Sequence, residues 1–333
     1  MNLYLHGLGH FHPENEITNA FLESLDIETN EDWIMDRVGI RSRRTTLPLD
    51  YIKETKNKDP RVGIEAADYS NAELGSRAGA MALERAGVSA DQIGLVIAGG
   101  CAPDFAIPAE AARISDLLGI EATAFDIGSA CTSFFAAVRV LSMMDPAQLP
   151  EFVLIVASEV MTRTINYNDR NSAVLWGDGA VAAVISTRTT GPATILGSDL
   201  ESSPAGNGKV TIPRLGFFEQ EGRAVQMFAI KKTIKGLAHL QEEFGQNDRN
   251  FHFVGHQANL RMLENVCRKC DIPNERHHYN VDWYGNTGAA SGMSVVSMNW
   301  HKWMPQDDIA LVGVGSGLTW GRYLVRMAEG KTA

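Results

Sequence analysis

Continuous apolar runs alternate with helix-length mixed stretches along the first half of the chain. Residues 93–98 (IGLVIA) are apolar throughout, which is typical of a strand buried on both faces. Residues 72–86 are predicted to form a helix that ends at Gly87, because glycine commonly terminates helices. The same reasoning predicts strands over 3–8, 122–127, 152–157 and 180–185, and helices over 109–118 and 131–144. This order predicts an α/β protein with mainly parallel strand pairing.

The second half repeats this pattern at an offset of about 158 residues. Chance similarity between α/β units is the alternative explanation, but three segments correspond in the same order. They are 83–99 with 240–256, 129–138 with 287–296, and 153–158 with 310–315. We therefore predict two halves, 1–188 and 189–333, that meet at the linker-like sequence 187–194. Two long polar stretches are expected to be a surface excursion (43–72) and a lid or binding loop (202–223).

Composition narrows the class of protein. The 333 residues are 44% hydrophobic and 21% charged, an ordinary balance for a well-packed globular chain. The net charge of -10 argues against nonspecific nucleic-acid binding. The first residues lack the features of a secretory signal, and no apolar run is long enough for a membrane span. Four cysteines do not make a disulfide scaffold, so we expect a reduced, cytoplasmic protein.

Cys131 is the best candidate for a nucleophile. It lies in FDIGSACTSFFAA (125–137), where a predicted strand leads through small residues into an apolar helix. Unpaired backbone N–H groups and the dipole at a helix start stabilise a thiolate and lower the pKa of the thiol. The alternative is a structural role, because free cysteine is often a small buried hydrophobic residue.

Two polar residues of the second half are candidates for the same site. His256 follows a strand-like run in VGHQANLRM, where it can serve as a base or hydrogen-bond donor. Asn286 lies in WYGNTGAAS, beside a glycine. Taken alone, His256 can be structural and Asn286 a turn residue. Ligand sites in parallel sheets gather at the carboxyl ends of strands. The predicted duplication places His256 and Asn286 at such ends in the second half, and Cys131 at the matching end in the first half.

Four segments then stand out together: DIGSACTSF, GHQANLRM, YGNTGAAS and GSGLTWG, in this order. They resemble the signature segments of β-ketoacyl-ACP synthase III, within the thiolase superfamily. The resemblance extends to EDWIMDRVGIRSRR near the start and NDRNSAVLWGDGAVAAV in the middle, and covers essentially the whole chain. It implies a thiolase-like fold, with two duplicated α/β halves in a five-layered α-β-α-β-α arrangement, and a homodimer.

The resemblance also implies a role for each matching residue. Cys131 corresponds to the acyl-accepting cysteine, and His256 and Asn286 to the pair that assists decarboxylation. The backbone N–H groups of Cys131 and Ser316 correspond to the oxyanion hole. The other matches are Trp33, Arg37, Arg170, Phe228 and Asn259 for coenzyme A and its pantetheine arm, Arg261 for carrier-protein docking, and Ile107 for the wall of the partner's acyl pocket.

The implied reaction is the decarboxylative Claisen condensation of an acyl-CoA primer with malonyl-ACP. The thiolate forms an acyl-enzyme, and two backbone donors stabilise the tetrahedral oxyanion. His256 and Asn286 donate hydrogen bonds to the enolate that forms as carbon dioxide leaves. No metal or redox cofactor is expected, because carbon dioxide loss drives the reaction. The expected partners are acyl-CoA and acyl carrier protein.

Other functions remain open at this stage. An acyltransferase of specialised metabolism could use Cys131 without decarboxylation, and an inactive partner subunit is a non-enzymatic alternative. A Cys-His-Asn hydrolase would lack its CGSCW signature here. Three positions depart from the family pattern and leave the primer's identity open: Gly255, Ala224 and Ile107. Proline is usual at position 255, and the glycine there is expected to loosen the turn.

Two further motifs are weaker. Cys267 and Cys270 form a CxxC pattern without the second pair that a zinc site needs. The basic run RSRR (41–44) is either a solvated face or a contact to phosphate or carrier protein.

Overall fold

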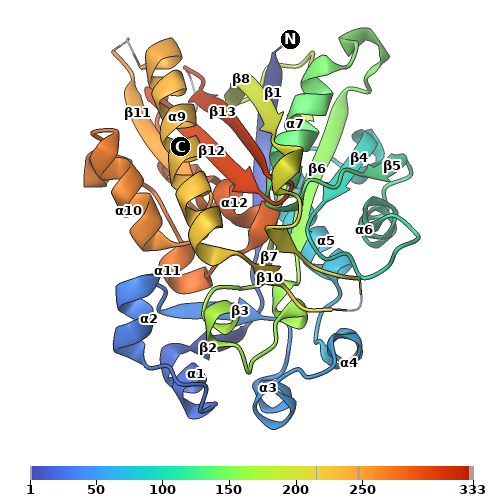
Figure 1. Cartoon of the computed structure of the whole chain (residues 1–333). Helices are drawn as coiled ribbons and strands as arrows, with labels where there is room; N and C mark the ends of the chain where they lie inside the picture. Colours follow the sequence, from blue (N-terminus) through green and yellow to red (C-terminus); the bar gives the residue numbers. More distant parts are fainter. Residues whose placement is uncertain (1, 215, 246–247, 330–333) are drawn as a thin grey trace.

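A nine-stranded sheet crosses the whole molecule in the computed structural model, which describes residues 2–214, 216–245 and 248–329 (Figure 1). The strand order is β11-β12-β13-β8-β1-β7-β6-β4-β5. The first-half strands are β1 (Leu3–Phe11), β4 (Ile93–Gly99), β5 (Thr123–Asp126), β6 (Phe152–Glu159) and β7 (Gly179–Ser186). The second-half strands are β8 (Ala193–Ser202), β11 (Asn250–Gly255), β12 (Asp307–Gly315) and β13 (Thr319–Met327). The two groups join where β1 pairs with β8, with Leu3 opposite Ile195.

The helices and the sheet form five layers. Helices α5 (Asn71–Ala86) and α6 (Glu110–Leu118) pack with the outer face of the first-half strands in one apolar cluster. Helices α9 (Gly222–Phe244) and α10 (Leu260–Lys269) pack with the outer face of the second-half strands in another. The largest cluster lies between the two groups of strands and contains α7 (Ser133–Met143) and α12 (Ser291–Met298). The predicted thiolase-like α-β-α-β-α arrangement is therefore confirmed.

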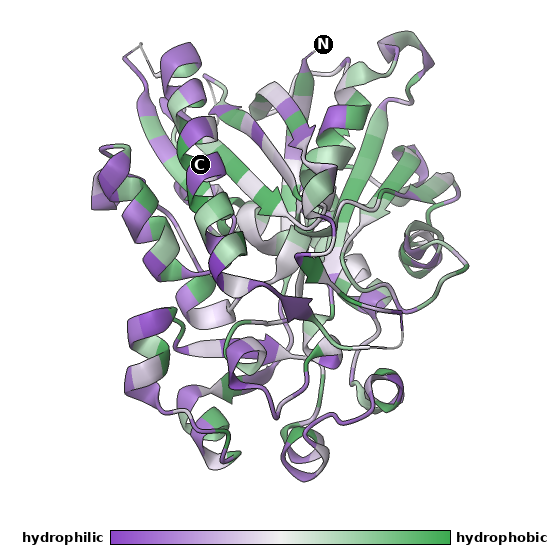
Figure 2. Cartoon of the chain, viewed as in Figure 1, coloured by the Kyte–Doolittle hydropathy of each residue, from purple (hydrophilic) through white to green (hydrophobic). Residues whose placement is uncertain are grey.

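Hydropathy explains which helices lie in the middle. Helix α7 is mostly apolar and α12 consists mostly of small and apolar residues, so both can lie in the interior. The outer helices carry polar faces, which Figure 2 shows as purple on α9 and α10. Green strands fill the interior of the same view.

The prediction of mainly parallel pairing is wrong. Among the described strands of this sheet, only the pairs β4–β5, β4–β6 and β11–β12 are parallel. Strands β12 and β13 are joined by a short turn, which forces an antiparallel hairpin. Between β6 and β7 the chain forms only short helical turns instead of a covering helix, and these strands are also antiparallel. The alternation of strands and helices in the sequence did not reveal these direct connections, so the antiparallel pairs were not predicted.

Most predicted elements are confirmed. Residues 72–86 fall within α5, and Gly87 ends it with a left-handed φ of 65°. The predicted helix 131–144 begins later than expected, because Ala130–Thr132 forms a 3-10 turn, η2, before α7. The three matched segment pairs form the same kinds of element in both halves, although residues 246 and 247 lie outside the described residues. The boundary between 1–188 and 189–333 stays a prediction.

Residues 43–72 are not the expected surface excursion. They contain helices α3 (Leu49–Thr55) and α4 (Pro60–Ala66) and belong to a small lobe with its own apolar cluster. The lobe also contains α1 (Asn19–Ser24), α2 (Glu31–Arg37), β2 (Asn15–Thr18) and β3 (Ser42–Thr45), below the sheet in Figure 1. Arg43 is fully buried, and its guanidinium donates to Asn19 Oδ1 (2.6 Å) and the Val174 carbonyl (3.0 Å to Nε). The 41–44 run is therefore not one solvated basic face.

Candidate active site

Cys131 lies in a sharp turn between a strand and a central helix. The chain leaves β5, and Ala130 adopts a left-handed φ of 47° at the start of η2. Such a conformation costs a non-glycine residue roughly 1–2 kcal/mol. The surrounding packing holds this turn, so that Cys131 stands just before α7 and lines a cavity.

Two side chains favour the thiolate of Cys131. Cys101 Sγ lies 3.8 Å from Cys131 Sγ, and its thiol is the main cause of a Cys131 pKa well below the ordinary value. Burial opposes this effect, and hydrogen bonding and charge from His256 add to it. The second half of the chain therefore supplies a group that acts on the first-half cysteine, as predicted for the nucleophile and its histidine.

His256 is held in place through one ring nitrogen. It follows β11 directly, and its backbone N–H donates to the Val312 carbonyl (2.9 Å). Nδ1 lies 2.8 Å from Ser291 Oγ at the start of α12, which leaves Nε2 for Cys131. Gly255 packs closely against α10, because a Cβ there would lie 2.4 Å from Leu263 Cδ2, and the expected loosening of the turn stays a prediction. A larger residue at 255 therefore needs a shift of the Leu263 side chain.

Asn286 lies beside the same cavity. Its backbone pairs with the stretch around Trp176, donating to the Leu175 carbonyl (2.8 Å) and accepting from the Gly177 N–H (3.0 Å). Trp176 itself lines the cavity that contains Cys131. Asn286 Oδ1 accepts from the Gly288 N–H (3.0 Å), so the amide is oriented with Nδ2 as the donor available to a ligand. Asn286 is buried, with 5% of its surface exposed.

A buried glutamate connects the two halves behind Cys131. Glu159, at the end of β6, is fully buried. Its Oε2 accepts from the Cys101 N–H (2.9 Å), and its Oε1 accepts from the Ala289 N–H (2.8 Å). Burial, and next the charge of Cys131, raise the pKa of Glu159 to about 8. The sequence analysis missed this residue because its two partners are 58 and 130 positions away.

The turn after β12 lies against the Cys131 turn. A Cβ on Gly315 would lie 3.3 Å from the Cys131 backbone nitrogen, so this glycine permits close approach. Ser316 Oγ donates to the Val210 carbonyl (2.6 Å), and Thr319 Oγ1 lies 2.6 Å from Thr132 Oγ1. Ser316 lies at the edge of the same cavity, and its oxyanion role stays a prediction.

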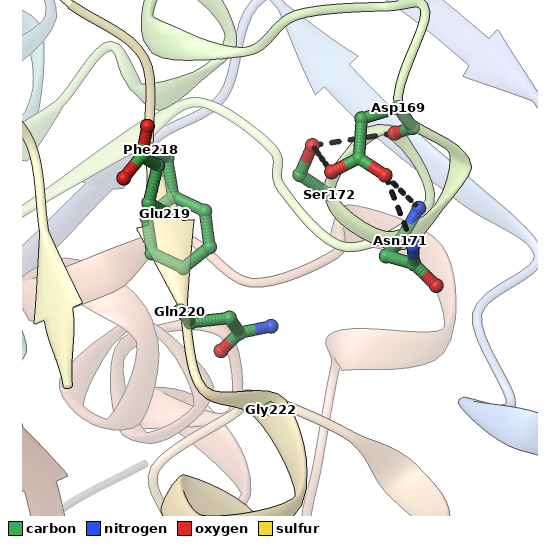
Figure 3. Close-up of a pocket in the computed structure, with 7 residues that line it drawn as sticks. All are labelled: Asp169, Asn171, Ser172, Phe218, Glu219, Gln220 and Gly222. Carbon is green, nitrogen blue, oxygen red and sulfur yellow. Dashed lines mark hydrogen bonds between the residues drawn. The ribbon is translucent and has the colours of Figure 1, made fainter.

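Two cavities share one wall. The inner cavity, about 160 Å³, contains Cys131 and is lined by Cys101, Met161, Trp176, Val210, Phe218 and Ser316 among others. The outer cavity, about 460 Å³, lies between residues 169–172 and 218–222 (Figure 3). Phe218 lines both cavities and contacts Trp176 edge-on at 4.8 Å. Residues 210–212 and 218–222 of the stretch 202–223 contribute to the walls of these cavities, and residue 215 lies outside the described residues. The role of 202–223 as a lid or binding loop stays a prediction.

Comparison with known proteins matches this architecture. Residues 125–204 match the family described as 3-oxoacyl-(acyl-carrier-protein) synthase III, and residues 245–327 match its C-terminal region. A β-ketoacyl-(acyl-carrier-protein) synthase III from Roseiflexus sp. (strain RS-1) is 34% identical over 96% of this chain and 97% of its own length. A β-ketoacyl-(acyl-carrier-protein) synthase III from Clostridioides difficile (strain 630) is 30% identical over 96% of this chain and 97% of its own length. The crystal structure of 3-oxoacyl-(acyl-carrier-protein) synthase III from Aquifex aeolicus VF5 is 26% identical and superposes with a TM-score of 0.86, covering 97% and 99% of the two chains.

The chain belongs to the β-ketoacyl-ACP synthase III family. It is therefore an acyltransferase of the condensing type, as predicted. The alternative of a Cys-His-Asn hydrolase is excluded, because both the fold and the family differ. The comparisons do not favour the acyltransferase without decarboxylation.

Three predicted coenzyme A contacts of this synthase meet around one indole ring. The Arg37 guanidinium lies 4.7 Å from the Trp33 ring centroid, and that of Arg170 lies 5.0 Å from it. Arg170 is also held by the Glu28 carbonyl (2.5 Å). With Arg170 in direct contact with the ring, a nucleobase can enter between them only if Arg170 moves.

Asn259 and Arg261 join α10 to the small lobe. Asn259 Oδ1 caps the helix by accepting from the Met262 N–H (3.0 Å), and its Nδ2 donates to the Arg37 carbonyl (3.2 Å). Arg261 donates to the Met35 carbonyl (2.9 Å) and pairs with Glu264 at 3.1 Å. Both residues thus have structural partners besides the roles predicted for them.

Phe228 and Ile107 lie away from the two cavities. The Phe228 ring packs on Trp320 at 5.5 Å, within the apolar cluster under α9. Phe228 thus has a structural partner, and its place in the pantetheine tunnel stays a prediction; Phe218 and Gly222 line the two cavities and are further candidates for that lining. Ile107 is 83% exposed on the loop after β4.

The CxxC cysteines lie at the end of α10, where burial raises the pKa of Cys267 to about 12.

Proposed function

We propose that this synthase condenses an acyl-CoA primer with malonyl-ACP through an acyl group on Cys131. The supporting observation is that His256, from the second half, acts on the Cys131 thiol of the first half and contributes to its lowered pKa. Attack by the thiolate on the acyl thioester forms a new thioester and expels the coenzyme A thiolate. The N–H groups of Cys131 and Ser316 are the donors for the tetrahedral oxyanion.

Decarboxylation is the second half of the proposed reaction. Malonyl-ACP enters after coenzyme A leaves, and His256 Nε2 and Asn286 Nδ2 donate hydrogen bonds to its thioester oxygen. These bonds stabilise the enolate that forms as carbon dioxide departs. The enolate carbon then attacks the acyl carbonyl on Cys131, which returns the thiolate. No metal or redox cofactor enters this scheme, because carbon dioxide loss supplies the driving force.

The proposed substrate path uses the outer and inner cavities in sequence. The adenine of coenzyme A is assigned to Trp33 with Arg37 and Arg170, and the pantetheine arm to the outer cavity and Asn259. Carrier-protein docking near Arg261 is supported by its position at the surface, where its side chain is 43% exposed.

We also propose that the enzyme is a homodimer of the cytoplasm. The loop after β4 exposes Ile107 (83%) and Phe105 (52%), which is an unfavourable arrangement unless a partner covers these side chains. The reaction needs Cys131 as a free thiol, which suits a reducing compartment. None of the described helices is long and apolar enough to span a bilayer. Sedimentation velocity of the purified chain tests the dimer, and a monomer at micromolar concentration would contradict it.

Release of labelled carbon dioxide from malonyl-ACP tests the proposed function. Acyl-CoA should trigger stoichiometric release together with 3-oxoacyl-ACP formation. Transfer of the acyl group without release would support the non-decarboxylating acyltransferase instead. An enzyme that neither takes the acyl group nor releases carbon dioxide would support an inactive subunit.

A further inference from the structure

A second cysteine lies against the nucleophile. Cys101 occupies the loop that follows β4, and its sulfur is 3.8 Å from the Cys131 sulfur. Both cysteines are free and partly buried, and both line the inner cavity. The condensation proposed above has no use for the Cys101 thiol as a reactant.

We propose that Cys101 is a resolving cysteine, which forms a reversible disulfide with Cys131 when the enzyme meets a hydroperoxide. This inference rests on the same reactive Cys131 as the proposed function. It adds a modification site and a class of reactant, the hydroperoxides.

The geometry permits the bond with a small movement. A disulfide brings two sulfurs to about 2.05 Å, so these two must approach each other by about 1.8 Å. The Cys101 backbone is held by Glu159 through its N–H, but its loop (100–109) has no helix or strand among its residues. Rotation of the two side chains and a local shift of this loop supply the approach. Cys131 has less freedom, because η2 and α7 fix its backbone.

The reactivities of the two sulfurs differ in the required direction. Hydrogen bonds from Cys101 and His256 favour the thiolate on Cys131, which makes it the sulfur that attacks a peroxide. Cys101 is the opposite case, because its contact with the Cys131 thiolate and its burial raise the pKa of its thiol. It remains a thiol until the charge on Cys131 has been removed by oxidation.

The steps balance as follows. The Cys131 thiolate attacks one peroxide oxygen and breaks the O–O bond, which gives a sulfenic acid and releases hydroxide or an alkoxide. The Cys101 sulfur then attacks the Cys131 sulfur and displaces hydroxide, which leaves as water with the Cys101 proton. Two thiols have lost two electrons and the peroxide has gained them. A thiol reductant reverses the bond by exchange.

The modification has two consequences for the enzyme. The disulfide removes the nucleophile, so condensation stops until a reductant restores it. It also prevents further oxidation of Cys131 to the irreversible sulfinic acid. An acyl group already on Cys131 blocks the first step, so acyl-CoA should protect the enzyme from peroxide.

The test uses the full-length reduced enzyme with a several-fold molar excess of hydrogen peroxide, because the sulfinic acid consumes two peroxide molecules per thiol. Acid quench, thiol alkylation and non-reducing peptide mapping follow. The wild type should lose the mass of two hydrogen atoms, yield a peptide linked through 101 and 131, and regain its activity with dithiothreitol. Cys101→Ser, whose hydroxyl can still donate to the Cys131 thiolate, should instead gain two oxygen atoms on Cys131, without recovery. Cys270→Ser, a control in the CxxC pair, should form the linked peptide as the wild type does.

A wild type that reaches the sulfinic acid as fast as Cys101→Ser would overturn the inference, as would a linked peptide that contains Cys267 or Cys270. Incubation with acyl-CoA separates this failure from that of the proposed function. If Cys131 takes an acyl group but forms no disulfide, only the redox inference fails. If it does neither, the proposed function fails as well.

Discussion

Ser291 Oγ lies 2.8 Å from Nδ1 of His256 and thereby directs the other ring nitrogen toward Cys131. The serine opens α12, a helix buried between the two groups of strands, so the imidazole is positioned by the centre of the fold. The reactivity of a first-half cysteine thus depends on a histidine and a serine of the second half.

Replacing His256 should move the reactivity of Cys131 to higher pH. The hydrogen bond and charge of His256 contribute to the lowered Cys131 pKa, so His256→Ala raises that pKa and reduces the thiolate fraction at a given pH. The rate of Cys131 alkylation by iodoacetamide, followed by peptide mapping against pH, should show its midpoint displaced upward. Condensation should fall by roughly 10²–10⁴-fold. An unchanged midpoint would show that His256 does not act on the sulfur, and Ser291→Ala should show a smaller displacement.

Changing Asn286 to aspartate should separate acylation from decarboxylation. Aspartate keeps the oxygen that accepts from the Gly288 N–H but replaces the Nδ2 donor with an acceptor. Loss of a donor to a developing oxyanion costs roughly 10²–10³-fold in rate. We expect normal acyl transfer to Cys131 and a loss of that order in carbon dioxide release. Equal losses in both half-reactions would assign Asn286 a structural role only.

Trp33→Ala should weaken the use of acyl-CoA specifically. Stacking of a base on an aromatic ring contributes roughly 1–3 kcal/mol, which corresponds to a rise in KM of about fivefold or more. The maximal rate of acylation should be retained. The same acyl group on N-acetylcysteamine lacks adenine and provides the matched control. If KM for this short thioester rises as much as that for acyl-CoA, Trp33 acts on the fold and not on the nucleotide.

The ionisation of Glu159 should make stability fall with rising pH. The pKa of Glu159 is raised to about 8 in the folded protein, so between its unfolded value and pH 8 the native state binds more protons than the unfolded state. Unfolding free energy therefore decreases with pH over this window, by up to about 5 kcal/mol. Urea unfolding from pH 5 to 8 measures the slope. Glu159→Gln should flatten it, while lowering stability at pH 5 by about 1–3 kcal/mol because one of the two N–H groups loses its acceptor. An equal slope in both proteins would contradict the raised pKa.

Local patterns predicted most of the elements, because α5, β4 and β6 satisfy their sequence signals within their own residues. The strand directions could not be predicted in this way, since they depend on whether a connection crosses the sheet, as at β6 and β7. The burial of Arg43 was also missed. Its partners, Asn19 and the Val174 carbonyl, are distant in sequence, and a basic run normally indicates solvent exposure.

Some residues of the candidate site carry a local sequence signal and could be predicted, and others carry none. Cys131, His256 and Asn286 stand at the ends of recognisable segments, and family resemblance supplied their roles. Cys101 and Glu159 carry no local signal, and only the fold brings both to Cys131. Phe218 lies in an irregular stretch that carries no signal of its own, and it lines the cavity that contains Cys131. Phe228 lies in a clear helix with its ring against Trp320, and its tunnel role stays a prediction.

The acyl group on Cys131 is the central claim, and intact-protein mass spectrometry tests it most directly. The enzyme is incubated with a panel of acyl-CoAs, without malonyl-ACP, and the adducts are mapped to a peptide. We predict one acyl group per chain on Cys131 for the preferred primers, and none on Cys131→Ala. A wild type that stays unmodified with every primer, or an adduct that persists in Cys131→Ala, would contradict the account.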